Sequence, residues 1–344
     1  MKNKDLLPSE LRYDPVSQDW VVIATGRARR PDSFAKDRKS VVLADSVEEC
    51  PFEDMDTQKT PTLMISRGAR REIVAGAPLP QDWTTVSFPN KYPAFAPEGS
   101  FVTRIQGPYE ATDGIGFHEV VATRDHARDV ADFTLPEAEE LLAAYQTRFL
   151  ELKKVEFVNY ISIFKNKGAG AGASIAHPHS QIVAIPMLDP EIEGSIRGSQ
   201  SYYAKKGTCV HCDMLEYDRK EKIRVVYENE KFVAVCPFAS IVAFETRIYP
   251  IHHASRFEET SKEDIGFFAD ALVLALGKIK KALGDPDYNY FIHTSPTDSG
   301  EYGHYHWHVE ILPKSAHWAG FELSTGIPIS TLEPEKAAEF LRTI

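Results

Sequence analysis

Two histidines and a glutamine share one face of a short predicted strand. The segment AHPHSQIVAIP, residues 176–186, spaces His177, His179 and Gln181 two residues apart, and alternate side chains of a strand point to the same side. A neutral imidazole is a good nucleophile toward phosphorus near neutral pH, and the bond that it forms stays reactive enough for a second transfer. Three polar groups on one face of an otherwise apolar strand therefore indicate a functional site.

Cysteines add a second kind of chemistry. Cys209 and Cys212 form a C-x-x-C pair, and the chain has only 4 cysteines in 344 residues, too few for a disulfide scaffold. In a reducing compartment, such a pair more often binds a metal ion or carries out redox chemistry. No thioredoxin-like strand–helix–strand pattern surrounds the pair, which favours the metal.

The composition is that of a folded protein with a large core. With 43% hydrophobic residues among 344, the chain can bury a large core. A net charge of -11 argues against binding to nucleic acid or to an anionic membrane. The start MKNKDLLPSEL lacks the apolar core of a signal peptide, and no run approaches the roughly 20 apolar residues of a spanning helix. We therefore expect a cytoplasmic protein.

The chain contains an internal repeat. The segment YHWHVEILP, residues 305–313, follows the same pattern as AHPHSQIVAIP, so that His306 and His308 match His177 and His179. The repeat indicates that the two parts of the chain are related halves.

Each half also combines a histidine with a helix and with short strands. His126 and His253 each precede a segment with apolar residues at helical spacing, which begins with a Thr–Glu or Ser–Asp capping pair. Strands are predicted at residues 20–24, 118–123, 160–164, 224–227, 232–236 and 289–294. Short strands joined by turns favour antiparallel sheets, so we predict an α+β fold of two halves.

A polar segment rich in glycine and serine, residues 187–207, separates the two halves. We predict a first half over residues 1–190, which contains His179, and a second over residues 191–344, which contains the C-x-x-C pair. The separating segment could equally be a surface loop within one body.

The order of these motifs resembles that of the galactose-1-phosphate uridylyltransferases, which belong to the histidine-triad superfamily. The resemblance covers nearly the whole chain and rests on FKNKGAGAGASIAHPHSQIV (164–183), DPVSQDWVVIATGRARRP (14–31), SFPNKYPAF (87–95), Asp125 with His126, and a C-terminal GFE. It implies two histidine-triad-like halves, each an antiparallel half-barrel sheet with a packed helix.

The resemblance implies a double displacement on a nucleotide sugar. His179 would attack the α-phosphorus of UDP-glucose, release glucose 1-phosphate and pass UMP to galactose 1-phosphate. Related hydrolases carry a third histidine where this chain has Gln181, and glutamine cannot act as an acid, which favours transfer. The other positions that the resemblance assigns to catalysis or substrate binding are Ser174, Arg27, Arg30, Asn90, Tyr92 and Asn166.

Metal ions are also implied by the resemblance. In the first half, the matching ligand positions are Cys50, Glu53, His126 and His177, where Glu53 replaces a cysteine of the family pattern. Carboxylate oxygen is an ordinary zinc ligand, although the change can widen the choice of metal.

The second half has its own ligand set. The positions with thiolates and imidazoles at spacing suited to tetrahedral zinc are Cys209, Cys212, His253 and His306. Some relatives instead bind iron with three histidines and a glutamate, and the nearest matches here are His293, His306, His308 and Glu193.

The hexose loop departs from the family pattern. A Gly-Tyr-Glu loop holds the hexose in the family, and Gly320, Phe321 and Glu322 occupy it here, while the family's lysine and glutamine are replaced by Ala316 and Pro328. A nucleoside diphosphate glucose phosphorylase, which uses inorganic phosphate as acceptor, is therefore an alternative. A non-catalytic nucleotide-binding protein is a second alternative. Family members commonly form dimers, so we expect a homodimer.

Overall fold

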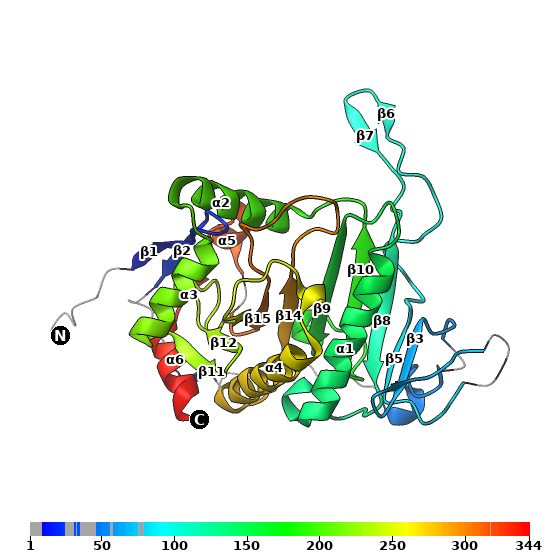
Figure 1. The fold of residues 1–344 in the computed structure, drawn as a ribbon. Helices are drawn as coiled ribbons and strands as arrows, with labels where there is room; N and C mark the ends of the chain where they lie inside the picture. Colours follow the sequence, from blue (N-terminus) through cyan, green and yellow to red (C-terminus); the bar gives the residue numbers. More distant parts are fainter. Residues whose placement is uncertain are drawn as a thin grey trace.

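An antiparallel sheet of 11 strands forms the centre of the computed structural model (Figure 1). The structure describes residues 9–24, 31, 33–34, 46–55, 58–74, 77, 79–316 and 318–344. The strand order is β11–β12–β13–β15–β14–β9–β10–β8–β5–β3–β4. In chain order the bounds are β3 Leu63–Ser66, β4 Ala69–Arg70, β5 Thr85–Pro89, β8 Phe117–Thr123, β9 Tyr160–Lys167, β10 His179–Ile185, β11 Val225–Glu228, β12 Phe232–Val235, β13 Thr246–Pro250, β14 Tyr288–His293 and β15 His308–Pro313.

Two related halves meet at the middle of this sheet. Strands β3, β5, β8, β10 and β9 come from the first half, and β14, β15, β13, β12 and β11 follow in the corresponding order from the second. The central pair β9–β14 is antiparallel and sets Phe164 opposite Phe291. The predicted α+β fold of two antiparallel halves is confirmed. The division at residue 190 stays a prediction, because the sheet runs without a break across both halves.

Helices α1 (Leu135–Leu152) and α4 (Lys262–Leu283) lie side by side on one face of the sheet (Figure 1). At the start of α1 the backbone N–H of Thr134 donates to the carboxylate of Glu137 at 2.7 Å, as the predicted capping pair requires. The apolar faces of both helices join strands from both halves in one core, whose fully buried members include Leu142, Phe149, Phe268, Leu272, Ile163 and Ile311.

The segment that we predicted as a linker or surface loop, residues 187–207, is instead mostly helix α2 (Pro190–Lys206). Asp189 caps it by accepting hydrogen bonds from two backbone N–H groups of the first turn, and proline follows at the first helical position, where no hydrogen bond is lost. A Cβ on Gly198 would lie 1.9 Å from the backbone oxygen of Val16. This glycine therefore serves close packing of α2 against the N-terminal segment, which composition alone did not reveal.

Smaller elements flank the sheet. Strands β1 (Glu10–Tyr13), β2 (Trp20–Ile23) and β16 (Ile329–Ser330) form a second sheet, and β6 (Arg104–Gln106) with β7 (Tyr109–Ala111) forms a hairpin that projects from the molecule (Figure 1). The remaining helices are α3 (Val210–Glu221), α5 (Gly320–Thr325), α6 (Pro334–Thr343) and the 3-10 turns Val47–Glu49, Val130–Asp132, Ala169–Ala171 and Phe257–Glu259. Within the described ranges, no helix has the length and apolar character needed to span a membrane.

Candidate active site and metal centres

His179 begins strand β10, after a glycine-rich turn. Gly168 and Gly172 have φ angles of 80° and 87°, in the left-handed region that favours glycine. A Cβ on Gly168 would lie 2.1 Å from a carboxylate oxygen of Asp287, so no side chain fits there. The N–H of Gly170 donates to the same carboxylate at 2.8 Å. The GAGAGAS segment thus folds closely around Asp287 and leads into the start of β10.

The ring of His179 is almost buried, with 8% of the residue exposed. Its Nδ1 atom lies 2.8 Å from the backbone oxygen of His177 and must donate, since a carbonyl only accepts. Burial lowers the pKa of His179 to about 4, although the hydrogen bond to His177 acts in the opposite direction. The imidazole is therefore neutral at pH 7, and Nε2 keeps the lone pair that a nucleophile needs.

A buried ion pair supports the backbone of this histidine. The Nζ atom of Lys165 donates to the backbone oxygen of His179 at 3.1 Å and lies 3.0 Å from a carboxylate oxygen of Asp129. The hydroxyl of Tyr288 donates to Asp129 at 2.8 Å. Sequence reasoning missed these residues because they come from three separate segments that meet only under the sheet.

A cavity of about 390 Å³ opens beside His179. Five of the residues predicted for catalysis or nucleotide binding line it: Asn90, Tyr92, Ser174, His179 and Gln181. Phe52, Phe88 and Val120 give it apolar walls. An apolar cavity with a few convergent polar groups is the usual form of a small-molecule site.

Asn166 lies in the neighbouring cavity, also of about 390 Å³, between β9, β10 and β14. The side-chain oxygen of Asn166 accepts a hydrogen bond from Asn289 at 2.7 Å, which leaves its N–H groups for other acceptors. Phe164 and Val183 line the same cavity, which runs along the sheet face that also carries Gln181.

The loop predicted to bind the hexose does not join this site within one chain. Gly320, Phe321 and Glu322 form the start of α5, near the end of the molecule that holds β1 and β2, whereas β10 lies toward the other end (Figure 1). Glu322 accepts a hydrogen bond from the N–H of Ala319 at 3.1 Å, and Phe321 is 48% exposed. The two predicted arginines, Arg27 and Arg30, lie outside the described residues.

Three of the four predicted ligands of the first metal site converge, while Glu53 lies beside the two histidines but outside this group. Metal-binding atoms of Cys50, His126 and His177 all lie within 4.8 Å of one another. The Nδ1 atom of His177 is 3.5 Å from Sγ of Cys50 and 3.2 Å from Nδ1 of His126. Glu53 places Oε1 3.4 Å from both of these Nδ1 atoms, while its Oε2 accepts from Arg124 at 2.7 Å. The sulfur and the two nitrogens suit zinc, and the oxygen of Glu53 would be the fourth ligand.

The second predicted set is also brought together, as Cys209, Cys212, His253 and His306. The Sγ atom of Cys212 lies 3.4 Å from Nδ1 of His253 and 3.6 Å from Nδ1 of His306. A hydrogen bond from Cys212, with further ones from the two histidines, lowers the pKa of Cys209 well below its usual value. Two sulfurs and two imidazoles that favour a thiolate fit tetrahedral zinc.

A third cluster of possible metal ligands differs from the iron site that we expected. Metal-binding atoms of Glu191, His293 and Glu310 converge, and Glu193 is not among them. Residues two apart on a helix point about 200° apart, so only one of the two glutamates of α2 faces the sheet. His306 belongs to the cysteine cluster, and the ring of His308 lies 5.0 Å from that of His293.

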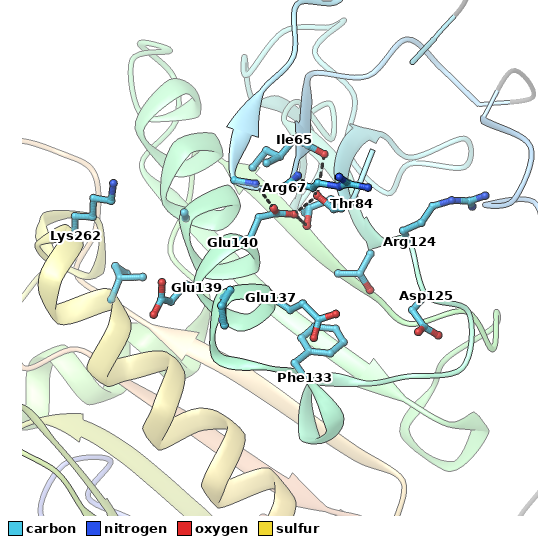
Figure 2. Close-up of a pocket in the computed structure, with 16 residues that line it drawn as sticks. Ile65, Arg67, Thr84, Arg124, Asp125, Phe133, Glu137, Glu139, Glu140 and Lys262 are labelled. Atoms are coloured by element: carbon cyan, nitrogen blue, oxygen red, sulfur yellow. Dashed lines mark hydrogen bonds between the residues drawn. The ribbon is translucent and has the colours of Figure 1, made fainter. Parts of the chain in front are cut away.

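A larger cavity, of about 750 Å³, lies by α1 and α4 (Figure 2). Among the described residues, none of those predicted for catalysis or substrate binding lines it. Figure 2 shows that Glu140 is already occupied, since its carboxylate accepts from the hydroxyls of Thr84 and Thr85 at 2.6 Å and from the N–H of Gly68 at 2.6 Å. We therefore assign the chemistry to the smaller cavity around His179.

Comparisons with known proteins cover most of the chain. The family described as "Galactose-1-phosphate uridyl transferase, N-terminal domain" matches residues 2–188, and a domain of unknown function, DUF4921, matches residues 115–343. An ADP-glucose phosphorylase of Arabidopsis thaliana is 32% identical over 342 residues, 97% of this chain and 93% of that protein. A galactose-1-phosphate uridylyltransferase of Thermotoga maritima is 32% identical over 344 residues, 97% of this chain and 98% of that protein.

Solved structures of an ADP-glucose phosphorylase and of a uridylyltransferase both superpose on this chain. The ADP-glucose phosphorylase from Arabidopsis thaliana with bound ADP-glucose superposes with a TM-score of 0.81 at 30% identity, and covers 98% of this chain and 99% of its own. A structure described as a uridylyltransferase has a TM-score of 0.72 at 26% identity, with 97% of each chain covered.

Proposed function

Because this chain belongs to the galactose-1-phosphate uridylyltransferase family, we propose that it transfers UMP from UDP-glucose to galactose 1-phosphate by double displacement. The observation that carries the proposal is the state of His179. Its ring is neutral, its Nδ1–H is bonded to the carbonyl of His177, and it lines a cavity together with Gln181 and Ser174.

In the first displacement, the Nε2 lone pair of His179 forms a bond to the α-phosphorus of UDP-glucose. The bond between this phosphorus and the bridging oxygen breaks, and glucose 1-phosphate leaves with the electron pair. The ring then carries a positive charge, which the Nδ1–H bond to the carbonyl of His177 stabilises. In the second displacement, a phosphate oxygen of the acceptor attacks the same phosphorus and returns the electron pair to Nε2.

The leaving phosphate needs little protonation, so the chain's main task is to position the reactants and stabilise the phosphoryl oxygens. Gln181 and Ser174, on the wall of the cavity, supply N–H and O–H donors for those oxygens. Asn90 and Tyr92, which line the same cavity, border the nucleoside in this proposal. Asn166 in the adjacent cavity faces the remaining phosphate.

A second candidate is phosphorolysis of ADP-glucose with inorganic phosphate as acceptor. It is favoured by the ADP-glucose phosphorylase relative, whose identity of 32% equals that of the uridylyltransferase of Thermotoga maritima. The altered hexose loop, with Phe321 in place of tyrosine, also supports it. Both candidates use the same nucleotidyl-His179 and differ only in nucleobase and acceptor.

We propose zinc at the two cysteine-containing clusters, with iron as a candidate at Glu191, His293 and Glu310. Zinc at the two cysteine clusters supplies structural cross-links rather than a reacting group. His177 is a proposed zinc ligand and its carbonyl holds the ring of His179, so the first zinc would stabilise the nucleophile's position.

A homodimer is part of the same proposal. Within one chain, the hexose loop at α5 and the cavity at β10 lie toward different ends of the molecule (Figure 1). The loop exposes Trp318, Phe321 and Leu323, of which Leu323 is 72% exposed. A loop that binds the sugar of a nucleotide held at His179 would have to come from a second copy of the chain. The cytoplasmic location stays a prediction.

The test is an assay of four combinations: UDP-glucose or ADP-glucose as donor, with galactose 1-phosphate or inorganic phosphate as acceptor. We expect the fastest turnover, with ping-pong kinetics, for UDP-glucose with galactose 1-phosphate. Fast phosphorolysis of ADP-glucose with negligible exchange of galactose 1-phosphate would replace our first candidate by the second. No turnover in any combination, together with nucleotide binding, would favour the non-catalytic alternative.

A further inference from the structure

We propose that His118 is a positioning residue that orients the side-chain amide of Gln181 so that its N–H groups, not its oxygen, face the reacting phosphate. This inference rests on the proposed nucleotidyl transfer. A glutamine amide has a donor end and an acceptor end of nearly equal shape, so packing alone does not choose between them. The choice matters, because an oxygen turned toward a phosphate would repel it.

The hydrogen-bond partners of His118 determine its tautomer. The backbone N–H of Ala94 points at Nδ1 of His118 from 3.1 Å, and a backbone N–H can only donate. Nδ1 therefore carries the lone pair, and in the neutral ring the hydrogen sits on Nε2. The Nε2 atom lies 2.7 Å from Oε1 of Gln181, so His118 donates and Gln181 accepts.

The neighbouring amide of Asn90 does not offer the Nε2 hydrogen a second acceptor. The side-chain oxygen of Asn90 accepts from the N–H of Tyr92 at 2.9 Å, so its NH₂ group is the end that lies 3.2 Å from Nε2 of His118. Two donors cannot bond to each other. The hydrogen on Nε2 therefore goes to Gln181, and the only acceptor near it is Oε1 among the described contacts.

The sheet register makes the contact possible. On the adjacent strands β8 and β10, His118 pairs with Val183 and Val120 pairs with Gln181. His118 and Gln181 are thus diagonal neighbours on one face, within reach of long side chains. With its oxygen held by His118, Gln181 directs its two N–H bonds into the cavity that it shares with His179.

His118 also anchors the loop that holds the nucleoside candidates. The N–H of Asn90 donates to the backbone oxygen of His118 at 2.8 Å, and the N–H of Ala94 donates to its ring. One residue thereby connects residues 90–94, which contain Tyr92, with the phosphate donor Gln181. Sequence reasoning did not single out His118, since it is distant in sequence from both partners.

The experiment is a double-mutant cycle on formation of the nucleotidyl adduct. His118→Phe keeps the ring and removes the hydrogen bond, and we expect it to slow single-turnover labelling by UDP-glucose or ADP-glucose about 10- to 100-fold, mainly in kcat. In the background of Gln181→Ala, the same substitution should change the rate less than about 2-fold. His118→Gln, which can present an N–H near the place of Nε2, should restore part of the rate.

Equal slowing in both backgrounds, or an effect confined to KM, would mean that His118 acts through the loop or the fold, and would overturn the proposal. A measurement that does not depend on activity distinguishes a wrong role for His118 from failure of the proposed function. With ¹⁵N-labelled histidine, the signal that disappears in His118→Phe should have the shift of an unprotonated Nδ1 and move in Gln181→Leu. A protonated Nδ1 overturns the assignment whether or not any nucleotide sugar reacts.

Discussion

The imidazole of His179 is held by the backbone of His177, with Nδ1 donating to the carbonyl oxygen at 2.8 Å. The second half keeps the same relationship, since Nδ1 of His308 lies 3.1 Å from the backbone oxygen of His306. The duplicated H-x-H motif therefore fixes a ring in each half. In the first half this ring lines a cavity together with Gln181. In the second half it lies 5.0 Å from the ring of His293, whose Nε2 atom is 3.2 Å from a carboxylate oxygen of Glu310.

Covalent labelling tests the nucleophile. Protein incubated with UDP-glucose or ADP-glucose labelled in the α-phosphate should retain a nucleotidyl group that survives base better than acid. His179→Ala should remove the label, because Nε2 of His179 is the attacking nitrogen in the proposed reaction. The matched variant His308→Ala removes the equivalent imidazole of the second half and should keep the label. A His179→Ala protein that labels like the wild type would refute the assignment.

The second metal centre is tested by metal content and stability. Cys209→Ser together with Cys212→Ser should remove about one equivalent of zinc and lower the Tm, since structural zinc binding is coupled to folding. Elemental analysis and thermal unfolding measure both. Cys236→Ala, which changes a buried cysteine outside the metal clusters, should lose stability but keep its zinc. An unchanged zinc content in the double variant would mean that these cysteines do not bind zinc.

Glu53 is tested as a ligand of the first metal site. Glu53→Ala should weaken zinc binding there about 10- to 100-fold in a chelator competition, because it leaves only three ligands. Arg124→Gln removes the partner of the other carboxylate oxygen and serves as the control, with zinc affinity within a few-fold of wild type. Equal affinity in Glu53→Ala and wild type would restrict the site to Cys50, His126 and His177.

Glu322 is tested as the hexose contact. Glu322→Gln retains an oxygen for the N–H of Ala319 but loses the charge, so turnover of UDP-glucose with galactose 1-phosphate should fall about 10-fold. Glu339→Gln, an exposed change on α6, should have no effect. Steady-state kinetics of both variants test this prediction. An unchanged rate for Glu322→Gln would mean that α5 does not bind the sugar.

The free energy of unfolding should depend on pH through the Glu137 carboxylate at the start of α1. Hydrogen bonding to Arg128 lowers the pKa of Glu137 to about 2, below its ordinary 4.5, so its contribution is complete above pH 4.5 and disappears as pH falls toward 2. Because the pair is partly exposed, Glu137→Gln should cost only about 1 kcal/mol of unfolding free energy at pH 7. Denaturant titrations should show this difference shrinking below pH 4.5, and a constant difference down to pH 2 would contradict the pairing.

The sequence alone determined those features that are encoded within one segment. The spacing of His179 and Gln181 assigned them to one strand face, although His177, predicted on the same strand, lies just before β10. The apolar spacing after Thr134 predicted α1. The repeat of H-x-H predicted two related halves. These conclusions follow from local periodicity, because the pitch of a strand or helix decides which neighbours share a face.

Only the tertiary structure decided which segments meet. Strand register brought His118 to Gln181, and helical phase selected Glu191 over Glu193. The packing of α2 against the N-terminal segment requires the close approach of Gly198 to Val16. These contacts join residues far apart in the chain, and their geometry arises from packing of the whole sheet, which the spacing within any single segment does not contain.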